Sequence, residues 1–238
     1  MQSPPFPWAS RFNQAAGAPL FFWARDAAGG TYALPPRSGD MAKNRKPEIV
    51  GRLEEADAAA AAAVSPYRQT VPIRLLSWLS KAGDQPPLRT FCAAAIAAGL
   101  AGGNRRLAAA GARALASHTL ATVLKDAVKH RVDRSRPRSS GDNKPKIKPG
   151  TNTAKEETSF PSGHSAGAAA VASAFAREFP EYAGPAYAAA GLIALAQVPR
   201  CSHYPSDVGA GLTIGIAADA ALDHALGAVP LAGDGTES

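Results

Sequence analysis

Five long apolar stretches, separated by short polar segments, constrain the fold of this chain more than any other feature. Alanine, the residue with the highest helix propensity, is abundant in them, and the alternation of polar and apolar residues that is typical of strands is scarce. We therefore predict an all-α protein, a helical bundle of about five core helices. The predicted core helices span residues 90–103, 107–124, 165–176, 182–198 and 208–226, and shorter helices are predicted at 54–64 and 72–79.

The length of 238 residues is enough to bury one sizeable core, so one main domain is expected. We assign this bundle domain to residues 71–229. Residues 1–70 are predicted to be a polar N-terminal extension, partly disordered, and no secretory signal peptide is evident at its start. Residues 230–238 are predicted to be a tail. Met41 opens a run that resembles a protein start, which makes translation from Met41 a further hypothesis.

The formal net charge of +7 is concentrated in one stretch. Residues 125–155 contain ten Lys or Arg and three Asp, so the rest of the chain balances to zero. Such a stretch indicates nucleic acid, an anionic membrane surface or an anionic substrate as a partner. No nucleic-acid motif and no interleaved aromatic residues accompany these cations, so nucleic acid is not expected as a partner.

A first block of chemistry-bearing residues lies within this basic stretch. Lys129 and Arg136 are seven residues apart, which on one helix places both side chains on the same face, and Pro137 marks the helix end. A guanidinium can bind two phosphate oxygens at once, and a lysine adds a point charge. The alternative is an ordinary solvated basic face.

A second block, Ser162-Gly163-His164, precedes an alanine-rich run that we expect to be helical. Backbone N–H groups at a helix start can bind an anion, and Gly163 lets the main chain approach a ligand closely. His164 would then lie beside a bound phosphate, where it can protonate a leaving oxygen. The alternative is a capping turn with a surface histidine.

A third block combines His203 with Asp207 four residues later. An aspartate that holds one imidazole nitrogen fixes the tautomer and leaves the other nitrogen free to attack. The alternative is an aspartate at a helix N-terminus beside an unrelated histidine.

Together the three blocks resemble the signature of the type 2 phosphatidic acid phosphatase superfamily, which also contains bacterial acid phosphatases and vanadium haloperoxidases. The resemblance covers roughly residues 75–225. It implies that His203 is a nucleophile that forms a phosphohistidine, that Asp207 orients it, and that His164 is the general acid. The residues expected to hold the phosphoryl oxygens are Lys129, Arg136, Ser162 and Gly163.

The chain departs from the family pattern at one position. The family places an arginine six residues before the nucleophilic histidine, and here that position is Gln197, which brings no charge. Losing an arginine that stabilises a phosphoryl transition state lowers the rate by on the order of 10³. Our hypothesis is that Arg200, three residues before His203, partly takes its place. The competing interpretation is a weakened site that retains only binding.

No cofactor and no metal are expected. The two cysteines, Cys92 and Cys201, have no metal-ligand or disulfide spacing, and the cations near the histidines would repel a metal ion.

Membrane insertion is expected from the resemblance more than from hydropathy. Residues 182–198 form seventeen uncharged residues, the lower end of a spanning length, whereas other stretches are shorter or contain Arg113, Asp219 or Asp223. Members of the superfamily with short helical connections are commonly multi-pass lipid phosphatases, so we expect a membrane-embedded bundle with the active site at helix ends. A soluble bundle is the alternative.

The resulting functional hypothesis is a metal-independent phosphatase that hydrolyses a phosphate monoester or pyrophosphate, of a lipid or of another phosphate ester, through a phosphohistidine. The alternatives are a catalytically weakened phosphate- or lipid-binding membrane protein and a soluble non-specific acid phosphatase. A vanadium haloperoxidase is disfavoured, because those enzymes are generally much longer.

Overall fold

Helices make up most of the chain in the computed structural model, which describes residues 22–25, 31–34, 48–141, 144–151 and 154–227. The described α-helices are α2 (Glu48–Val64), α3 (Val71–Leu79), α4 (Gln85–Ala101), α5 (Arg105–Lys129), α6 (Gly163–Glu178), α7 (Ala183–Leu195) and α8 (Pro205–Gly227). The prediction of an all-α fold is confirmed. The five predicted core helices correspond to α4–α8, and the two shorter ones correspond to α2 and α3.

Short strands complete the described elements. β1 (Phe22–Arg25) pairs with β2 (Thr31–Leu34), and β3 (Val132–Arg134) pairs with β4 (Ile147–Pro149), both antiparallel. The β3–β4 ribbon lies in the basic stretch, where the sequence pattern predicted only a loop.

The chain divides into two compact units, Met1–Val50 and Gly51–Ser238. β1 and β2 belong to the first unit, and all the elements of the helical bundle belong to the second. The domain boundaries predicted from the sequence, 1–70, 71–229 and 230–238, stay predictions. The hypothetical start at Met41 and the tail lie outside the described residues.

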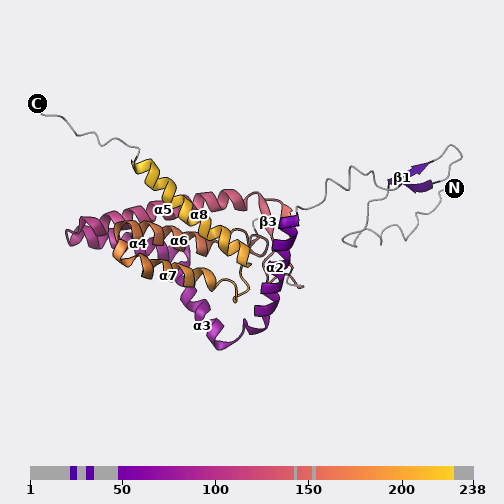
Figure 1. Cartoon of the computed structure of the whole chain (residues 1–238), viewed down its shortest axis with the longest axis horizontal. Coiled ribbons are helices and arrows are strands. Elements are labelled where there is room, and N and C mark those ends of the chain that lie inside the picture. The colour runs from indigo at the N-terminus through magenta and orange to yellow at the C-terminus, as the bar shows by residue number, and fades with distance from the viewer. Residues whose placement is uncertain (1–21, 26–30, 35–47, 142–143, 152–153, 228–238) are drawn as a thin grey trace, which may run out of the picture. The chain divides into compact units, whose positions relative to one another are not determined.

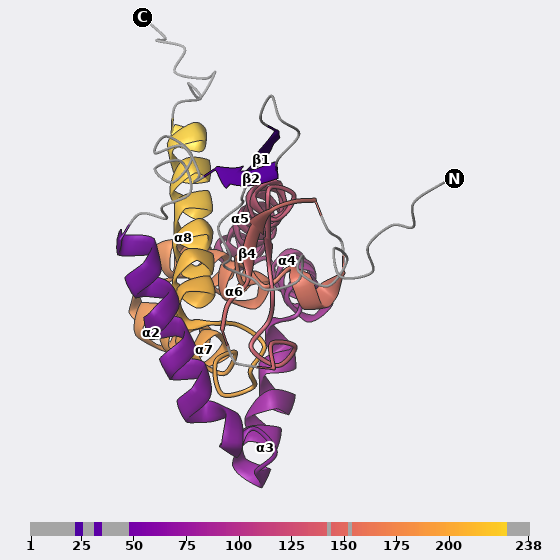
Figure 2. The same ribbon diagram turned by 90° about the vertical axis from the view of Figure 1, so that its right-hand side faces the viewer.

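Helix α6 forms the centre of the bundle (Figures 1 and 2). It contacts α4, α5, α7 and α8, and nearly every residue between Ser165 and Ala176 is buried. Most of these residues are alanine or glycine, so four helices can approach α6 closely around its whole circumference. The abundance of alanine therefore reflects close packing as well as helix propensity.

Two glycines of α8 fix its distance from α6. A Cβ atom on Gly211 would lie 2.5 Å from the Ser162 carbonyl oxygen, and one on Gly215 would collide with the Ala166 carbonyl oxygen. The backbone N–H of Ser162 also donates to the Asp207 carbonyl oxygen at 3.0 Å. These contacts hold the N-terminal ends of α6 and α8 side by side.

Helices α2 and α3 lie at the end of the bundle where α6 and α8 begin (Figure 2). On α2, Asp57 and Ala61 are buried. On α3 no residue is buried, and Val71, Leu75 and Trp78 are among its exposed apolar residues. Of the described helices, α5 is the one that is long and apolar enough to cross a membrane.

Candidate active site

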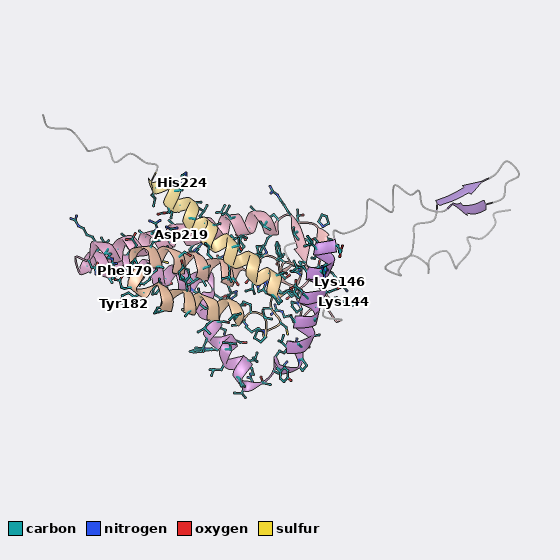
Figure 3. All side chains as sticks on the ribbon, viewed as in Figure 1. Lys144, Lys146, Phe179, Tyr182, Asp219 and His224 are labelled. Atoms are coloured by element: carbon teal, nitrogen blue, oxygen red, sulfur yellow. The ribbon has the colours of Figure 1, made fainter. Side chains whose placement is uncertain are left out.

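The three sequence blocks meet at one end of the bundle. The C-terminal end of α5, the residues after β3 and the N-terminal ends of α6 and α8 all lie there. In Figure 3, Lys144 and Lys146 mark this end, whereas Phe179 and Tyr182 mark the opposite one. The arrangement agrees with the expectation of a site at helix ends.

His203 lies just before α8 with a side chain that is 3% exposed. Its Nδ1 lies 2.7 Å from the Ser159 carbonyl oxygen, and its Nε2 lies 3.4 Å from Nη1 of Arg136. When Nδ1–H donates to the carbonyl, Nε2 keeps its lone pair. Burial lowers the pKa of His203 to about 4, with Arg136 acting in the same direction and Asp207 against it. The imidazole is therefore neutral at physiological pH and can act as a nucleophile.

Asp207 supports His203 less directly than the spacing predicts. Its Oδ2 lies 3.6 Å from Nδ1 of His203, which is longer than a hydrogen bond. The same oxygen accepts from the backbone N–H of Tyr204 at 2.9 Å, and Oδ1 forms a buried ion pair with Arg134. The direct acceptor for His203 is thus the Ser159 carbonyl, with the carboxylate as a nearby negative charge.

Arg134 connects this carboxylate to a second one from a distant part of the chain. Its Nη2 lies 2.5 Å from Oδ2 of Asp57 on α2, and both side chains are almost fully buried. Asp57 also accepts from the backbone N–H of Ser206 at 3.0 Å, and Nη1 of Arg134 donates to the Ser206 hydroxyl at 2.7 Å. No local sequence pattern points to this set, because Asp57 resembles an ordinary acidic residue near a helix start.

The prediction that Lys129 and Arg136 share one helix face is wrong. Helix α5 ends at Lys129, and Arg136 follows strand β3. Both residues nevertheless reach the site. Nζ of Lys129 donates to the Thr158 carbonyl oxygen at 3.0 Å, and Nη1 of Arg136 donates to the Ser202 carbonyl oxygen at 3.0 Å. Burial lowers the pKa of Arg136 to about 10, so its guanidinium stays charged at neutral pH.

The N-terminus of α6 carries the second block. Ser162 is the N-cap, and its buried hydroxyl accepts from the backbone N–H and the hydroxyl of Ser165 at 3.4 and 2.9 Å. A Cβ on Gly163 would lie 3.3 Å from Cδ of Lys125, a buried residue that the sequence analysis did not select. The ammonium of Lys125 forms an ion pair with Asp126, so the backbone amides that begin this helix are the groups that favour an anion there.

His164 follows in the first turn of α6 and has its own acid partner. Its Nε2 lies 2.8 Å from Oδ1 of Asp84, which immediately precedes α4. Burial lowers the pKa of His164, Asp84 opposes that effect, and Arg200 and Arg136 add to it. The sensitivity of His164 to both arginines shows that it belongs to the same cationic site. Asp84 is a second carboxylate that no sequence pattern indicated.

Gln197 and Arg200 contact each other. Nη1 of Arg200 donates to the Ser80 hydroxyl at 2.5 Å and to Oε1 of Gln197 at 3.3 Å. The fully buried Gln197 also donates from Nε2 to the Ile193 carbonyl oxygen at 2.9 Å. Gln197 thus holds Arg200, which together with Arg136 places positive charge near His164.

An apolar groove adjoins the site. It has a volume of about 600 Å³ between α4, α6 and α7. Ile193 lies in its wall, and a Cβ on Gly83 would collide with the Ile193 side chain and lie 3.5 Å from the His164 ring. One end of the groove is therefore close to His164. Other residues that line it include Leu88, Phe91, Val171, Phe175 and Tyr182.

Within the described residues, no group of three or more His, Cys, Asp or Glu side chains is arranged to hold a metal ion.

The comparison with family models agrees with the sequence pattern. The sequence model of the PAP2 superfamily matches residues 110–227. A solved structure of a transmembrane PAP2-type phosphatidylglycerolphosphate phosphatase from Bacillus subtilis is similar to this chain, with 21% sequence identity and a TM-score of 0.47. The similarity covers 79% of this chain and 92% of that one. No curated protein sequence matches the chain.

Proposed function

We propose that this chain, which belongs to the PAP2 superfamily, is a phosphatase that hydrolyses a phosphate monoester or pyrophosphate of a lipid through a phosphohistidine on His203. The observation that carries the proposal is the state of His203. Its imidazole is buried and neutral, its Nδ1 is engaged by the Ser159 carbonyl, and its Nε2 faces the guanidinium of Arg136. A nucleophile beside a phosphate-binding cation is what in-line attack on phosphorus needs.

In the proposed reaction, Nε2 of His203 attacks the phosphorus while the bond to the leaving oxygen breaks. Lys129, Arg136 and Arg200 stabilise the charge on the phosphoryl oxygens, together with the amides at the start of α6. His164 protonates the leaving oxygen, because a bound phosphate dianion favours the protonated imidazole and Asp84 supports it. Water then attacks the phosphohistidine and releases phosphate.

We assign the charge stabilisation to side chains and not to a metal ion. The cations around His203 and His164 would repel a divalent metal, and they already supply positive charge where it develops. The expected reaction is therefore insensitive to chelators.

A lipid substrate is supported by two apolar features near the site. The groove between α4, α6 and α7 ends close to His164 and can receive an acyl or prenyl chain. Helix α3 exposes Val71, Leu75 and Trp78, a composition that suits a membrane interface. We propose that the protein is membrane-bound, with α5 as the best candidate span and a multi-pass arrangement of the bundle.

Gln197 supports a second candidate, a phosphate- or lipid-binding membrane protein with weak turnover. The family arginine is absent at this position, and the polar atoms of Gln197 bind Ile193 and Arg200. In this case the site would bind vanadate or phosphate tightly and release product slowly. A soluble acid phosphatase remains the third candidate, and it would prefer soluble esters.

The test is phosphate release in excess chelator from a panel of lipid phosphates and one soluble ester. Wild type should release phosphate and His203→Ala should not, whereas His130→Ala, which removes an exposed histidine, should match wild type. A radiolabelled, acid-labile phosphoenzyme should form in wild type and in His130→Ala, but not in His203→Ala. Release that survives in His203→Ala would refute the mechanism, and preference for the soluble ester would refute the lipid assignment.

A further inference from the structure

A second, polar pocket opens beside the candidate active site. It has a volume of about 270 Å³. Its lining comes from four separate parts of the chain: the segment before α3, α3 itself, the segment after Arg136 and the α7–α8 connection. The lining residues are Arg68, Gln69, Ser77, Arg138, Arg200 and Ser202. The reaction proposed above uses only Arg200 of this set.

The charge of this pocket is strongly positive. Among the described residues, no carboxylate oxygen lies within 4.0 Å of the side-chain nitrogens of Arg68 or Arg200, and Arg138 has one distant contact, 3.8 Å from Glu156. The arginines also act on each other. Burial lowers the pKa of Arg200, Asp84 opposes that effect, and Arg138 adds to it. Three like charges around one hollow repel one another, and an anion placed between them relieves that repulsion.

The pocket is continuous with the phosphate site. Ser202 lines the pocket, and its carbonyl oxygen accepts from Nη1 of Arg136, the same atom that faces Nε2 of His203. Arg200 lies close enough to His164 to lower its pKa. A group bound in the pocket is therefore a neighbour of a phosphoryl group bound at His203.

We infer that this pocket binds a second anionic group of the substrate, covalently close to the phosphate that is removed. Arg68 and Arg138 contact this second group, and Arg200 lies between the two anions. The inference rests on the proposed phosphatase function and narrows its substrate class to phosphate esters that bear two acidic groups. The second group is either the inner phosphate of a diphosphate or a separate phosphate on the headgroup.

The experiment compares three lipids with the same chain: a monophosphate, a diphosphate and a lipid with a second phosphate on a glycerol headgroup. The variants are Arg68→Gln, Arg138→Gln and the double variant. Arg74→Gln, which removes an exposed arginine of α3 outside the pocket, is the matched control. Each charge-assisted hydrogen bond is worth roughly tenfold or more in affinity.

We expect the double variant to lower kcat/KM about tenfold to a hundredfold for one or both doubly acidic lipids. Its kcat/KM for the monophosphate should stay within about twofold of wild type, and Arg74→Gln should match wild type on all three. Which doubly acidic lipid responds identifies the source of the second anion. Equal effects on all three substrates, or none on any, would overturn the inference.

A binding measurement separates this inference from the proposed function. The probes are methylenebisphosphonate, which has the spacing of a diphosphate, and propane-1,3-bisphosphonate, which has the wider spacing of two separate phosphates. At least one of them should stabilise the full-length wild-type protein against thermal unfolding more than methylphosphonate does, and the double variant should lose this difference. If wild type releases no phosphate from any lipid but still shows the difference, the phosphatase proposal fails and the pocket stands. If the difference is absent in wild type, the pocket assignment fails, whatever the activity.

Discussion

Buried charges occur at both ends of the α5–α6–α8 bundle, but they are neutralised differently. At the end away from the site, Asp219 of α8 is fully buried and lies 2.5 Å from Nε of Arg177 and 3.6 Å from Nε of Arg113. Figure 3 shows Asp219 on the part of α8 towards His224, on the side away from Lys144 and Lys146. At the site end, Lys129 donates to a carbonyl oxygen, and Arg200 donates to a hydroxyl and an amide oxygen.

This difference distinguishes charged groups that stabilise the fold from charged groups that are available to bind a ligand. Two arginines and two carboxylates, with Asp223 as the fourth group, join three helices by mutual neutralisation, and such a set needs nothing from outside. Cations that donate to neutral oxygens keep most of their charge available. The site end also contains a neutralised set, Asp57–Arg134–Asp207, which lies beside His203, the proposed nucleophile. The candidate site thus combines buried ion pairs, which neutralise each other, with cations that donate to neutral oxygens.

The largest expected effect comes from removing a cation at the site end. Arg200→Ala should lower kcat/KM by on the order of 10³, as much as Arg136→Ala, because its charge replaces the family arginine. Without phosphate, the melting temperature of Arg200→Ala should fall only slightly, because relief of the repulsion from Arg138 partly offsets the lost hydrogen bonds to Ser80 and Gln197. Steady-state kinetics and thermal unfolding test both parts. An unchanged rate would remove Arg200 from the site.

At the end of the bundle away from the site, we expect a loss of stability without a loss of activity. Asp219→Asn should lower the free energy of unfolding by about 3 kcal/mol, because it removes the fully buried carboxylate between Arg113 and Arg177 and leaves them the half-exposed Asp223. The kcat/KM of the folded protein should stay within about twofold of wild type, because the change is remote from the phosphate site. Asp223→Asn, at a half-exposed position, should cost less than about 1 kcal/mol. Denaturant titration measures both, and a selective loss of activity in Asp219→Asn would contradict the comparison.

The pH dependence of stability should report on His203. The pKa of its folded-state imidazole is about 4 and the ordinary value is 6.5, so between these values the unfolded chain binds a proton that the folded protein does not. The contribution is therefore full above pH 6.5 and is lost as the pH falls towards 4. The loss amounts to about 3 kcal/mol. The difference in unfolding free energy between wild type and His203→Asn, measured from pH 4 to 7, should show this slope; a flat difference would contradict it.

Asp57→Asn should have smaller effects, and it should lower both stability and activity, because Asp57 belongs to the neutralised set at the site end. It should lower the free energy of unfolding by about 2 kcal/mol, because Arg134 keeps Asp207 as a partner. It should also lower kcat about tenfold and shift the acid limb of the pH–rate profile, since Asp207 and His203 lose their support. Asp57→Glu should recover part of the rate, and Glu55→Gln, at an exposed position of α2, should behave as wild type. A change in stability alone would make Asp57 purely structural.

The sequence was sufficient to predict the helices and the residues of the three blocks. It did not predict the carboxylates that support them, Asp57 and Asp84. Alanine-rich stretches predict helices locally, and the four-residue spacing places His203 just before α8 and Asp207 in its first turn. Asp84 and Asp57 act through contacts across 80 and 77 residues of chain, which no local pattern encodes. Lys129 and Arg136 were placed on one helix because the seven-residue spacing fits two turns, whereas α5 ends at Lys129 and β3 intervenes.

The position of Asp57 also sets the minimum size of a functional fragment. The family-matched segment, 110–227, contains Arg134, Ser206 and Asp207 but not the α2 carboxylate that binds the first two. A fragment cut to that segment would carry every residue of the recognised signature and still leave a buried guanidinium half neutralised behind the nucleophile. If the proposed function holds, we therefore expect the smallest active fragment to begin before residue 57, upstream of the segment that matches the family.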